Sequence, residues 1–181
     1  MEQKANVAEI KAAIRNIPNF PSPGVQFKDI TPVLGNSRLF ASTIDLLTEG
    51  FQPGSIDTIV GIDARGFIFA AAAAFKLKAA FVPVRKKGKL PYSTYEQDYA
   101  LEYGTNTIAI HTDALHKGSR VLLVDDLLAT GGTAAAAAQL VGATGGAVVG
   151  FSFLIELDFL KGRQRLRGRR IDRIEALLHY T

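Results

Sequence analysis

The chain has 181 residues, of which 48% are hydrophobic and 21% are charged, as is typical of one soluble globular domain with a sizeable core. It contains no cysteine, which excludes disulfide bonds, thiolate zinc sites and a cysteine nucleophile. The net charge of +4 arises from residues 161–173, because the rest of the chain carries 14 basic and 16 acidic residues.

The N-terminal part predicts two helices separated by a proline-rich loop. Four apolar residues spaced by three and four form one face of the first helix: Val7, Ile10, Ile14 and Ile17. This charged stretch lacks the apolar core of a signal peptide, so we expect a cytoplasmic protein. Residues 18–32 contain four prolines, which excludes a helix or a central strand there. Residues 37–51 predict the second helix, with Ser37 as its N-cap.

From residue 56 onward, apolar strands alternate with apolar helices. The predicted strands are 56–60, the first part of 79–89, 106–111, 121–125 and 147–157, and the predicted helices are 67–77 and 131–143. Strands that are apolar throughout indicate a parallel sheet buried on both faces. We therefore predict an α/β fold with a central, mostly parallel sheet flanked by helices on both faces.

Two stretches of unusual composition are interpreted as ordinary structure. No charge occurs between Leu127 and Ile155, but six glycines interrupt this run, so it predicts a buried helix, a turn and a buried strand rather than a membrane span. Residues 161–173, KGRQRLRGRRIDR, carry seven basic residues without interleaved aromatics or a known DNA-binding motif. We interpret them as a solvated surface segment and expect no nucleic-acid partner.

The stretch VLLVDDLLATGGTA, residues 121–134, carries the clearest chemistry. A glycine-rich turn that opens a helix binds anions, because backbone N–H groups and the positive end of the helix point toward the ligand. We predict that a phosphate lies on the loop formed by Ala129, Thr130, Gly131, Gly132 and Thr133. The carboxylates of Asp125 and Asp126 are pure acceptors and suit the 2- and 3-hydroxyls of a sugar. The predicted ligand is therefore a ribose 5-phosphate.

A nucleoside triphosphatase is the competing interpretation of this stretch, because two acids after an apolar strand resemble a magnesium-binding strand end. That interpretation needs a phosphate-binding loop of the form GxxxxGK[ST], and the chain contains none. A dinucleotide-binding GxGxxG motif is also absent.

GIDARG and RKKGK are two further motifs that follow predicted strands, where ligands bind in parallel sheets.

VLLVDDLLATGGTA closely resembles the phosphoribosyl-pyrophosphate signature of the type I phosphoribosyltransferases. FPSPGVQFKDITPVL, GIDARGFIFA, VPVRKKGKLP and LEYG resemble, in the same order, motifs of the adenine-using branch of that family, and the resemblance covers about residues 18–160. It implies a single domain over residues 1–181, with an N-terminal helix and base-binding hood over 1–36 and a flexible catalytic loop over 87–104. It also implies a homodimer.

The resemblance implies transfer of phosphoribose from phosphoribosyl pyrophosphate to adenine N9, giving AMP and pyrophosphate in purine salvage. Mg²⁺ is the implied cofactor, held through the substrate and water near Asp125 and Asp126 without direct protein ligands. Residues of DARG and RKKGK are implied to bind pyrophosphate: Asp63, Ala64, Arg65, Arg85, Lys86 and Lys89. The family turn at DARG contains an unusual peptide. Of these residues, Arg65 and Lys89 are expected to be catalytic.

The flexible loop and the hood supply the remaining implied roles. Glu102 matches the family acid that meets adenine N7, and Tyr103 is expected beside the phosphoribosyl group. Phe27 matches the aromatic residue that stacks on the purine, with Val25, Gln26 and Lys28 around it. Gln26 departs from the aliphatic residue usual in the family, which bears on base preference if its side chain contacts the base.

Two alternatives to an adenine-specific enzyme follow from the same motifs. One is a phosphoribosyltransferase for another nucleobase, and the other is a non-catalytic regulator with the same fold. Intact Arg65, Lys89 and Glu102 favour an enzyme. A regulator would also be expected to carry a DNA-binding module. We expect neither nucleic acid nor a membrane as a partner.

Overall fold

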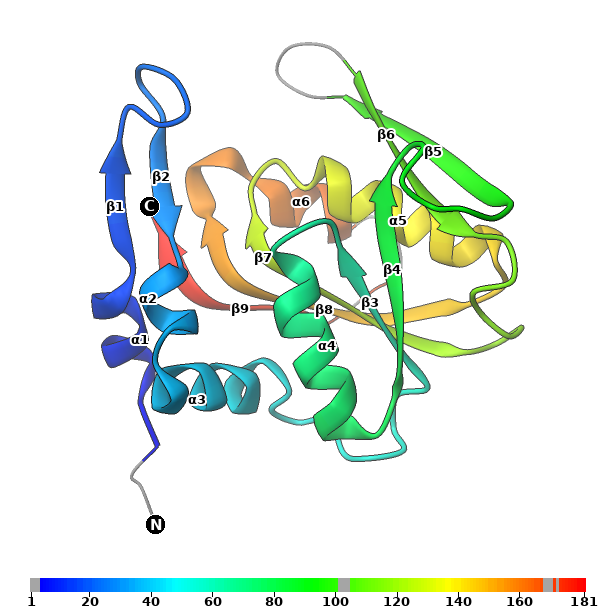
Figure 1. The fold of residues 1–181 in the computed structure, drawn as a ribbon, viewed down its shortest axis with the longest axis horizontal. Coiled ribbons are helices and arrows are strands. Elements are labelled where there is room, and N and C mark those ends of the chain that lie inside the picture. Colours follow the sequence, from blue (N-terminus) through cyan, green and yellow to red (C-terminus); the bar gives the residue numbers. More distant parts are fainter. Residues whose placement is uncertain (1–3, 101–104, 168–170, 172) are drawn as a thin grey trace. The chain divides into compact units, whose positions relative to one another are not determined.

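The computed structural model of the chain describes residues 4–100, 105–167, 171 and 173–181. The chain divides into two units, residues 1–46 and residues 47–181, which we describe separately. The N-terminal unit contains α1 (Val7–Ala13), β1 (Arg15–Pro18), β2 (Gln26–Asp29), α2 (Thr31–Leu34) and α3 (Ser37–Leu47, the last residue of which belongs to the second unit). Figure 1 shows the course of these elements along the chain.

The first helix is shorter than the predicted one. A capping box between Asn6 and Glu9 starts α1, which ends at Ala13. Ile10 and Ile14 are buried as predicted, whereas Val7 is exposed. The predicted helix is wrong at Ile17, which lies in β1 and pairs with Phe27 of β2. Ile17 precedes a proline, which disfavours helical backbone and favours an extended one.

The proline-rich stretch contains short elements rather than loop alone. Its residues 26–29 form β2, which pairs antiparallel with β1 in a separate two-stranded sheet and so agrees with the exclusion of a central strand. Helix α3 begins at Ser37, as predicted, but its cap is a different residue. The Asn36 side chain accepts a hydrogen bond from the Leu39 N–H at 3.0 Å, so the N-cap assignment to Ser37 is wrong.

The second unit is built on a seven-stranded sheet in the order β5-β6-β4-β3-β7-β8-β9. Its strands are β3 (Thr58–Ile62), β4 (Ala80–Lys86), β5 (Thr94–Ala100), β6 (Thr105–His111), β7 (Arg120–Leu128), β8 (Ala147–Leu157) and β9 (Ile174–Tyr180). The five strands from β4 to β9 in this order are parallel, and β6 pairs antiparallel with both β4 and β5. The mostly parallel sheet is therefore confirmed.

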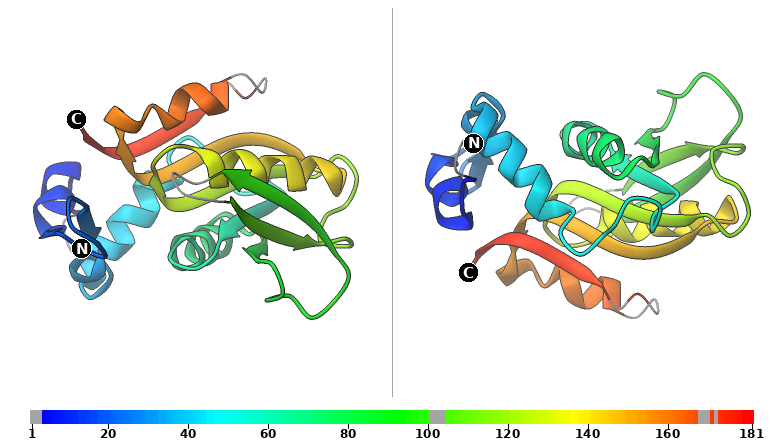
Figure 2. Two further views of the ribbon diagram at one scale, coloured as in Figure 1. Left: turned by 90° about the horizontal axis from the view of Figure 1, so that it is seen from above. Right: turned by 90° about the horizontal axis from the view of Figure 1, so that it is seen from below.

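Helices cover both faces of this sheet. They are α4 (Gly66–Leu77), α5 (Gly132–Ala143), the 3₁₀-helix η1 (Asp158–Leu160) and α6 (Gly162–Arg167). Figure 2 shows α4 on one face and α5 with α6 on the other. The five consecutive alanines of α5 are all buried, because small side chains let this helix lie close to the strands. The predicted α/β fold is confirmed.

The uncharged run from Leu127 to Ile155 forms the end of β7, helix α5 and most of β8, as predicted. Among the described residues, no helix is both long and apolar enough to cross a membrane. Two strands of the seven-stranded sheet were not predicted. β5 is polar and lies at the edge of the sheet, where one-sided burial requires few apolar residues. β9 follows the basic stretch and forms the opposite edge.

The interpretation of residues 161–173 as a solvated segment is wrong for several of its residues. Leu166 of α6 is fully buried in the main core. The Arg163 side chain is only 25% exposed and forms an ion pair with Glu156, whose side chain is 4% exposed. Arg165 and Arg167 are exposed, as predicted. One face of α6 therefore packs inward, and the basic composition of this stretch gave no indication of it.

Candidate active site

The candidate site lies at the carboxyl ends of three neighbouring parallel strands. Ile62 of β3 pairs with Val84 of β4, so the next residues, Asp63 and Arg85, lie side by side. Asp63 follows the end of β3, whereas Arg85 still belongs to β4 and pairs with Ala109 of β6. Gly61 of β3 pairs with Val124 of β7, which places Asp125 beside the end of β3. Ligands bind at this edge of parallel sheets, and the register brings GIDARG, RKKGK and DDLLATGGT to it together.

The predicted phosphate loop (residues 129–133) joins β7 to helix α5. Gly131 has φ 75°, a left-handed conformation that glycine adopts at low cost. Helix α5 begins at Gly132 with no side-chain cap among the described residues and no acidic residue in its first turn. Its first backbone N–H groups are therefore available to an anion. A pocket opens here, lined by Asp125, Leu127, Leu128 and residues 129–134.

The two adjacent aspartates have different surroundings. Asp125 lines the pocket with the phosphate loop, and its Oδ1 atom accepts a hydrogen bond from the Asp126 N–H at 2.9 Å. Asp126, 9% exposed, forms an ion pair with Arg65, with Oδ2 at 2.8 Å from Nη2. Asp125 is therefore the acid that faces the pocket, and Asp126 is the acid that holds the Arg65 guanidinium.

Burial raises the pKa of both carboxyl groups. The negative charge of Asp126 raises the pKa of Asp125 further, well above its usual value. For Asp126, burial is also the largest cause of the raised pKa, and the Arg65 guanidinium opposes it. Two buried acids side by side are unfavourable for folding, so the pair is typical of a site that is kept for a ligand.

The DARG turn is tied to the basic turn by polar contacts. The Asp63–Ala64 peptide bond is cis, which matches the unusual peptide of the family turn. Asp63 Oδ2 accepts a hydrogen bond from Arg85 Nε at 3.1 Å, and Arg85 Nη1 donates to the Lys89 carbonyl at 3.0 Å. Lys86 and Lys89 are exposed at this edge. The four basic residues predicted to bind pyrophosphate thus lie at the carboxyl ends of adjacent strands: Arg85 and Lys86 end β4, Lys89 lies beyond it, and Arg65 lies beyond β3.

Gly66 allows the DARG turn to lie close to the aspartates. It is the first residue of α4, and a Cβ atom added there would overlap Asp125 Oδ1 and lie 3.2 Å from Asp125 Cα. No larger residue fits without moving α4 away from β7. The glycine therefore sets the spacing between Arg65 and the two carboxylates.

The other predicted residues lie elsewhere. Glu102 and Tyr103 lie outside the described residues. The predicted adenine-binding residues belong to the N-terminal unit, where Val25 and Gln26 are exposed. Phe27 is half-buried, with its ring edge-on to Phe20 at 5.1 Å between centroids. Lys28 is also half-buried, and its burial lowers its pKa.

Gly162 is a residue of this region that sequence reasoning missed. A Cβ atom at Gly162 would overlap the Ala129 carbonyl oxygen and lie 3.0 Å from the Gly131 nitrogen. A Cβ atom at Gly131 would lie 2.7 Å from the Gly162 carbonyl oxygen. The backbones of α6 and the phosphate loop are therefore in direct contact. Backbone contacts between distant segments leave no motif in the sequence, and the surrounding arginines suggested only a solvated surface.

Comparison with known proteins identifies the family. Residues 31–173 match the family described as the phosphoribosyl transferase domain. An adenine phosphoribosyltransferase of Acidothermus cellulolyticus is 58% identical over 163 residues, which cover 90% of this chain and 92% of that protein. This chain belongs to the adenine phosphoribosyltransferase family.

Solved structures of the family agree with the fold. The crystal structure of adenine phosphoribosyltransferase from Rhodothermus marinus is 52% identical, with a TM-score of 0.91 over 96% of this chain and 98% of that one. The enzyme from Saccharomyces cerevisiae, complexed with D-2,5-dideoxy-2,5-imino-altritol 1,6-bisphosphate and adenine, is 43% identical, with a TM-score of 0.88 over 95% and 98% of the two chains. The predicted family and the predicted type I phosphoribosyltransferase fold are both confirmed.

Proposed function

We propose that this chain transfers phosphoribose from phosphoribosyl pyrophosphate to adenine N9, giving AMP and pyrophosphate. The main support for the proposal is that the acidic, basic and anion-binding motifs meet at the carboxyl ends of the parallel strands. The predicted phosphate loop opens beside Asp125, and Arg65 and Arg85 lie at the carboxyl ends of the adjacent strands. Membership of the adenine phosphoribosyltransferase family supports adenine over the other bases and an enzyme over a regulator. Purine salvage in the cytoplasm is the proposed setting.

The phosphoribosyl group is held at its two ends by different chemistry. The 5-phosphate accepts hydrogen bonds from backbone N–H groups of the phosphate loop and from the hydroxyls of Thr130 and Thr133. The ribose hydroxyls donate to Asp125, which lines the same pocket. Asp126 contributes mainly by orienting Arg65, because its carboxylate already pairs with that guanidinium. The anion and the carboxylates thus occupy opposite ends of the ligand.

Pyrophosphate is the leaving group and needs neutralisation as the bond to the ribose C1 carbon breaks. Arg65 presents a guanidinium with several N–H donors suited to phosphate oxygens, and Arg85, Lys86 and Lys89 add positive charge at the same edge.

The two carboxylates at the site also suit Mg²⁺, because carboxylates are the side chains this ion prefers and it usually keeps several waters. Asp125 and Asp126 would hold the ion through water, and it would supply charge neutralisation of the pyrophosphate.

Two further segments are proposed to bind adenine and to shield the reacting ribose carbon from water. Residues 1–36 form the proposed hood, in which Phe27 stacks on adenine and backbone groups near Gln26 and Lys28 read its edge. Residues 87–104 form the proposed catalytic loop, which excludes water from the oxocarbenium-like carbon. Glu102 is proposed to hold a proton at adenine N7, which eases loss of the proton at N9 as the new bond forms.

The direct test is the reaction itself. The protein is incubated with Mg²⁺, phosphoribosyl pyrophosphate and each purine or pyrimidine base in turn, and nucleotide formation is followed by chromatography. We expect AMP from adenine and little product from the other bases. Absence of AMP with adenine would exclude the proposed function, and a faster reaction with another base would correct the substrate.

Replacing Phe27 by alanine is expected to raise KM for adenine about tenfold, because stacking on an aromatic ring contributes about 1–3 kcal/mol per base. KM for phosphoribosyl pyrophosphate should change little, since the proposed stacking contact is with the base alone. Phe27→Tyr keeps the stacking face and should retain the wild-type KM for adenine. Steady-state kinetics with each substrate varied in turn measures both. An unchanged KM for adenine in Phe27→Ala would contradict the stacking role.

The chain is also proposed to form a homodimer through helix α4. This helix, GFIFAAAAAFKL, is apolar apart from Lys76 in its last turn, and a helix that is apolar around nearly its whole circumference is typical of one buried on all sides. One side packs on the sheet, but Ile68 is 41% exposed and Phe75, two turns along, is 90% exposed. We expect Phe75→Asp to shift the protein from dimer to monomer in light scattering, and Phe159→Asp, at another exposed phenylalanine, to leave the dimer intact. A dimeric Phe75→Asp variant would exclude this interface.

A further inference from the structure

Helix α6 lies directly against the phosphate loop, in a region to which the proposed function assigns no role. Gly162, the first residue of α6, has no room for a Cβ atom, because Ala129 O and Gly131 N occupy that space. Leu128 Cδ1 lies 3.0 Å from the same position. The contacts with Ala129 O and Gly131 N involve backbone atoms of the loop, which cannot move aside as the end of the Leu128 side chain can. A shift of Gly162 must therefore shift the loop.

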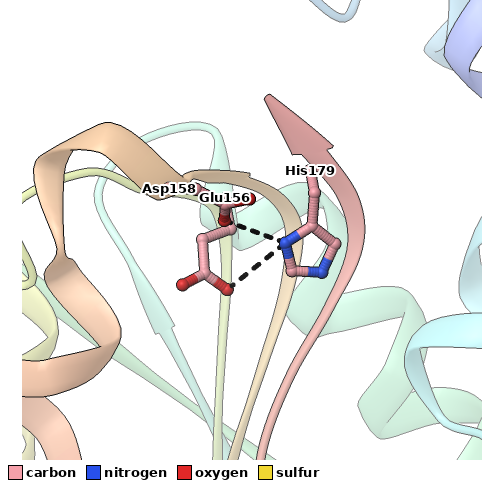
Figure 3. A group of neighbouring side chains, drawn as sticks. All are labelled: Glu156, Asp158 and His179. Atoms are coloured by element: carbon pink, nitrogen blue, oxygen red, sulfur yellow. Dashed lines mark hydrogen bonds and ion pairs between the residues drawn. The ribbon is translucent and has the colours of Figure 1, made fainter. Parts of the chain in front are cut away.

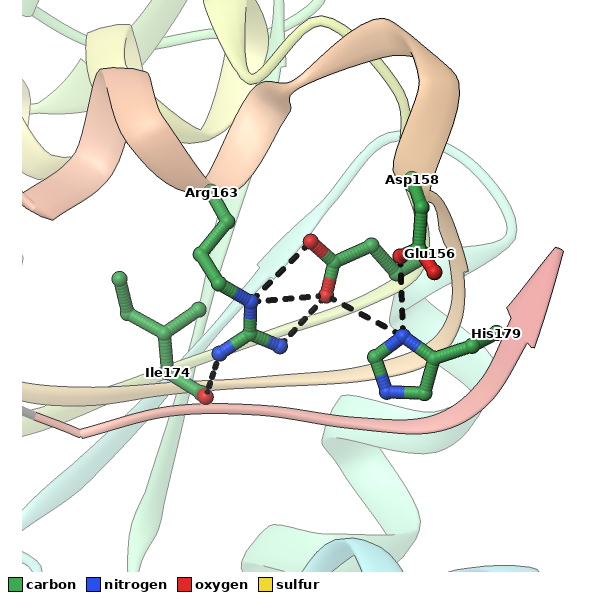
Figure 4. Close-up of polar contacts among 5 residues, drawn as sticks. All are labelled: Glu156, Asp158, Arg163, Ile174 and His179. Atoms are coloured by element: carbon green, nitrogen blue, oxygen red, sulfur yellow. Dashed lines mark hydrogen bonds and ion pairs between the residues drawn. The ribbon is translucent and has the colours of Figure 1, made fainter. Parts of the chain in front are cut away.

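Arg163 holds this end of α6 in place. Its Nε atom lies 3.1 Å from both carboxylate oxygens of Glu156, and its Nη2 atom donates to Glu156 Oε2. Its Nη1 atom donates to the Ile174 carbonyl of β9. Figure 4 shows the guanidinium reaching from α6 to both neighbouring strands. Because Glu156 lies in β8 and is almost fully buried, the ion pair anchors α6 to the sheet.

Two further residues extend this network on its exposed side. His179 Nδ1 lies 2.9 Å from Asp158 Oδ1 and 3.9 Å from Glu156 Oε2, and Figure 3 shows the three side chains converging. Such a cluster resembles a metal site in composition. However, both Glu156 oxygens already accept hydrogen bonds from a guanidinium, whose positive charge opposes a cation at the same atoms. Glu156 is therefore an ion-pair partner of Arg163.

The turn before α6 is also constrained. Lys161 has φ 55°, the left-handed region that is uncommon for residues with a side chain. Leu166, one turn after Gly162, is buried in the core against which α5 also packs. The backbone direction at Gly162 is thus determined on one side by the turn and on the other by Arg163 and Leu166. Residues 129–131 of the phosphate loop, which have no regular structure between β7 and α5, pack on this fixed surface.

We propose that Gly162 and Arg163 are positioning residues for the 5-phosphate of phosphoribosyl pyrophosphate, which deepens the proposed function and rests on it. Backbone N–H groups bind a phosphate well only when several of them point to the same place. The Gly162 backbone sets the course of Ala129–Gly131 and thereby the directions of the N–H groups that follow. Arg163 acts through Gly162 and touches no substrate.

The first test is Gly162→Ala, which adds one methyl group where the loop backbone lies. The dissociation constant of ribose 5-phosphate, measured by titration calorimetry, and KM for phosphoribosyl pyrophosphate should both rise on the order of 10- to 100-fold, as expected for small displacements of a binding group. KM for adenine should stay unchanged. Gly142→Ala is the matched control, because a Cβ atom there meets nothing within 4 Å in the helix behind the same loop.

The second test is Arg163→Lys, which keeps a positive charge beside the buried Glu156 but loses the fork that also reaches Ile174. We expect weaker ribose 5-phosphate binding, by about tenfold, with the protein still folded by circular dichroism. Arg165→Lys, at an exposed position of the same helix, should bind as the wild type does. A role in stability alone would lower the unfolding temperature and leave this affinity unchanged, which would overturn the inference.

The two levels of proposal fail in different ways. If the wild type makes no AMP and binds no ribose 5-phosphate, the proposed function is wrong. If the wild type binds ribose 5-phosphate and both Gly162→Ala and Arg163→Lys bind it equally well, only the positioning role is wrong. Should Gly162→Ala not fold, Arg163→Lys decides the question, since it introduces no added volume at the loop.

Discussion

Replacing Asp125 and Asp126 together by asparagine is expected to lower kcat/KM for phosphoribosyl pyrophosphate by about 10³-fold. Hydrogen bonds to charged groups contribute about 1.5–3 kcal/mol each, and each 1.4 kcal/mol is a factor of ten. An amide in place of the Asp125 carboxylate would present half the acceptor capacity to the ribose hydroxyls. An amide in place of the Asp126 carboxylate would no longer hold Arg65 by an ion pair. Initial rates at varied phosphoribosyl pyrophosphate and saturating adenine measure the loss.

The same double variant is expected to unfold at a higher temperature than the wild type near neutral pH. Both carboxyl groups have pKa values raised by burial, so the folded state binds protons that the unfolded state has released. Folding stability therefore falls as the pH rises from about 3.8, the ordinary pKa of an aspartate, through the raised values. Uncharged amides remove this penalty, so the stability gained by the variant should be larger at neutral pH than at about pH 4.

Asp113→Asn is the control for both effects, because Asp113 is an exposed acid in a turn at the opposite end of the sheet from the candidate site. It should change neither turnover nor unfolding temperature. Nearly normal use of phosphoribosyl pyrophosphate by the double variant would refute the ribose role of the acids. Comparison of the single variants separates their tasks: Asp125→Asn should weaken ribose 5-phosphate binding more than Asp126→Asn does, because only Asp125 lines the pocket.

Much of the fold followed from the sequence because the central strands are buried on both faces. β3, β7 and β8 each contain a run of apolar residues, and such runs between glycine-rich turns predict parallel strands without knowledge of their partners. β5 was missed because it is an edge strand with polar residues, stabilised by pairing with β6 rather than by its own composition. Strand order and register depend on contacts between distant residues, and no local pattern encodes them.

The candidate site was predictable where its chemistry lies in consecutive residues. Residues 125–133 contain both the acids and the phosphate loop, from the end of β7 to the start of α5. Because these residues are close in sequence, they are also close in the folded protein. The different surroundings of Asp125 and Asp126 were not predictable, since they arise from Arg65 of another strand end. Gly162 was not predictable either, because its contact with Gly131 joins segments 31 residues apart through backbone atoms alone. Local motifs thus identify reacting groups, whereas the residues that hold them require the fold.

Gly66→Ala is expected to lower turnover on the order of 10²-fold, because displacement of a binding group by about 1 Å has effects of that size. The added Cβ atom would overlap Asp125 Oδ1 and approach Asp125 Cα, so either the carboxylate or the start of α4 must move. Both movements separate Arg65 from the acids that it faces. Overpacking of this kind also destabilises the folded protein by about 1–3 kcal/mol, which thermal or urea unfolding will measure.

The loss of activity can be separated from the loss of stability with a second glycine. Gly146→Ala also lacks room, with Leu115 Cδ1 at 2.8 Å and Val141 Cγ1 at 3.0 Å from the added Cβ atom. Gly146 directly precedes β8, at the amino end of the parallel strands and so away from the candidate site. We expect Gly146→Ala to lower the unfolding temperature and to keep wild-type kinetics below it. If Gly66→Ala behaves in the same way, the close approach of α4 to Asp125 serves packing alone. A selective loss of turnover in Gly66→Ala would instead show that Gly66 sets the distance between the leaving-group site and the ribose site.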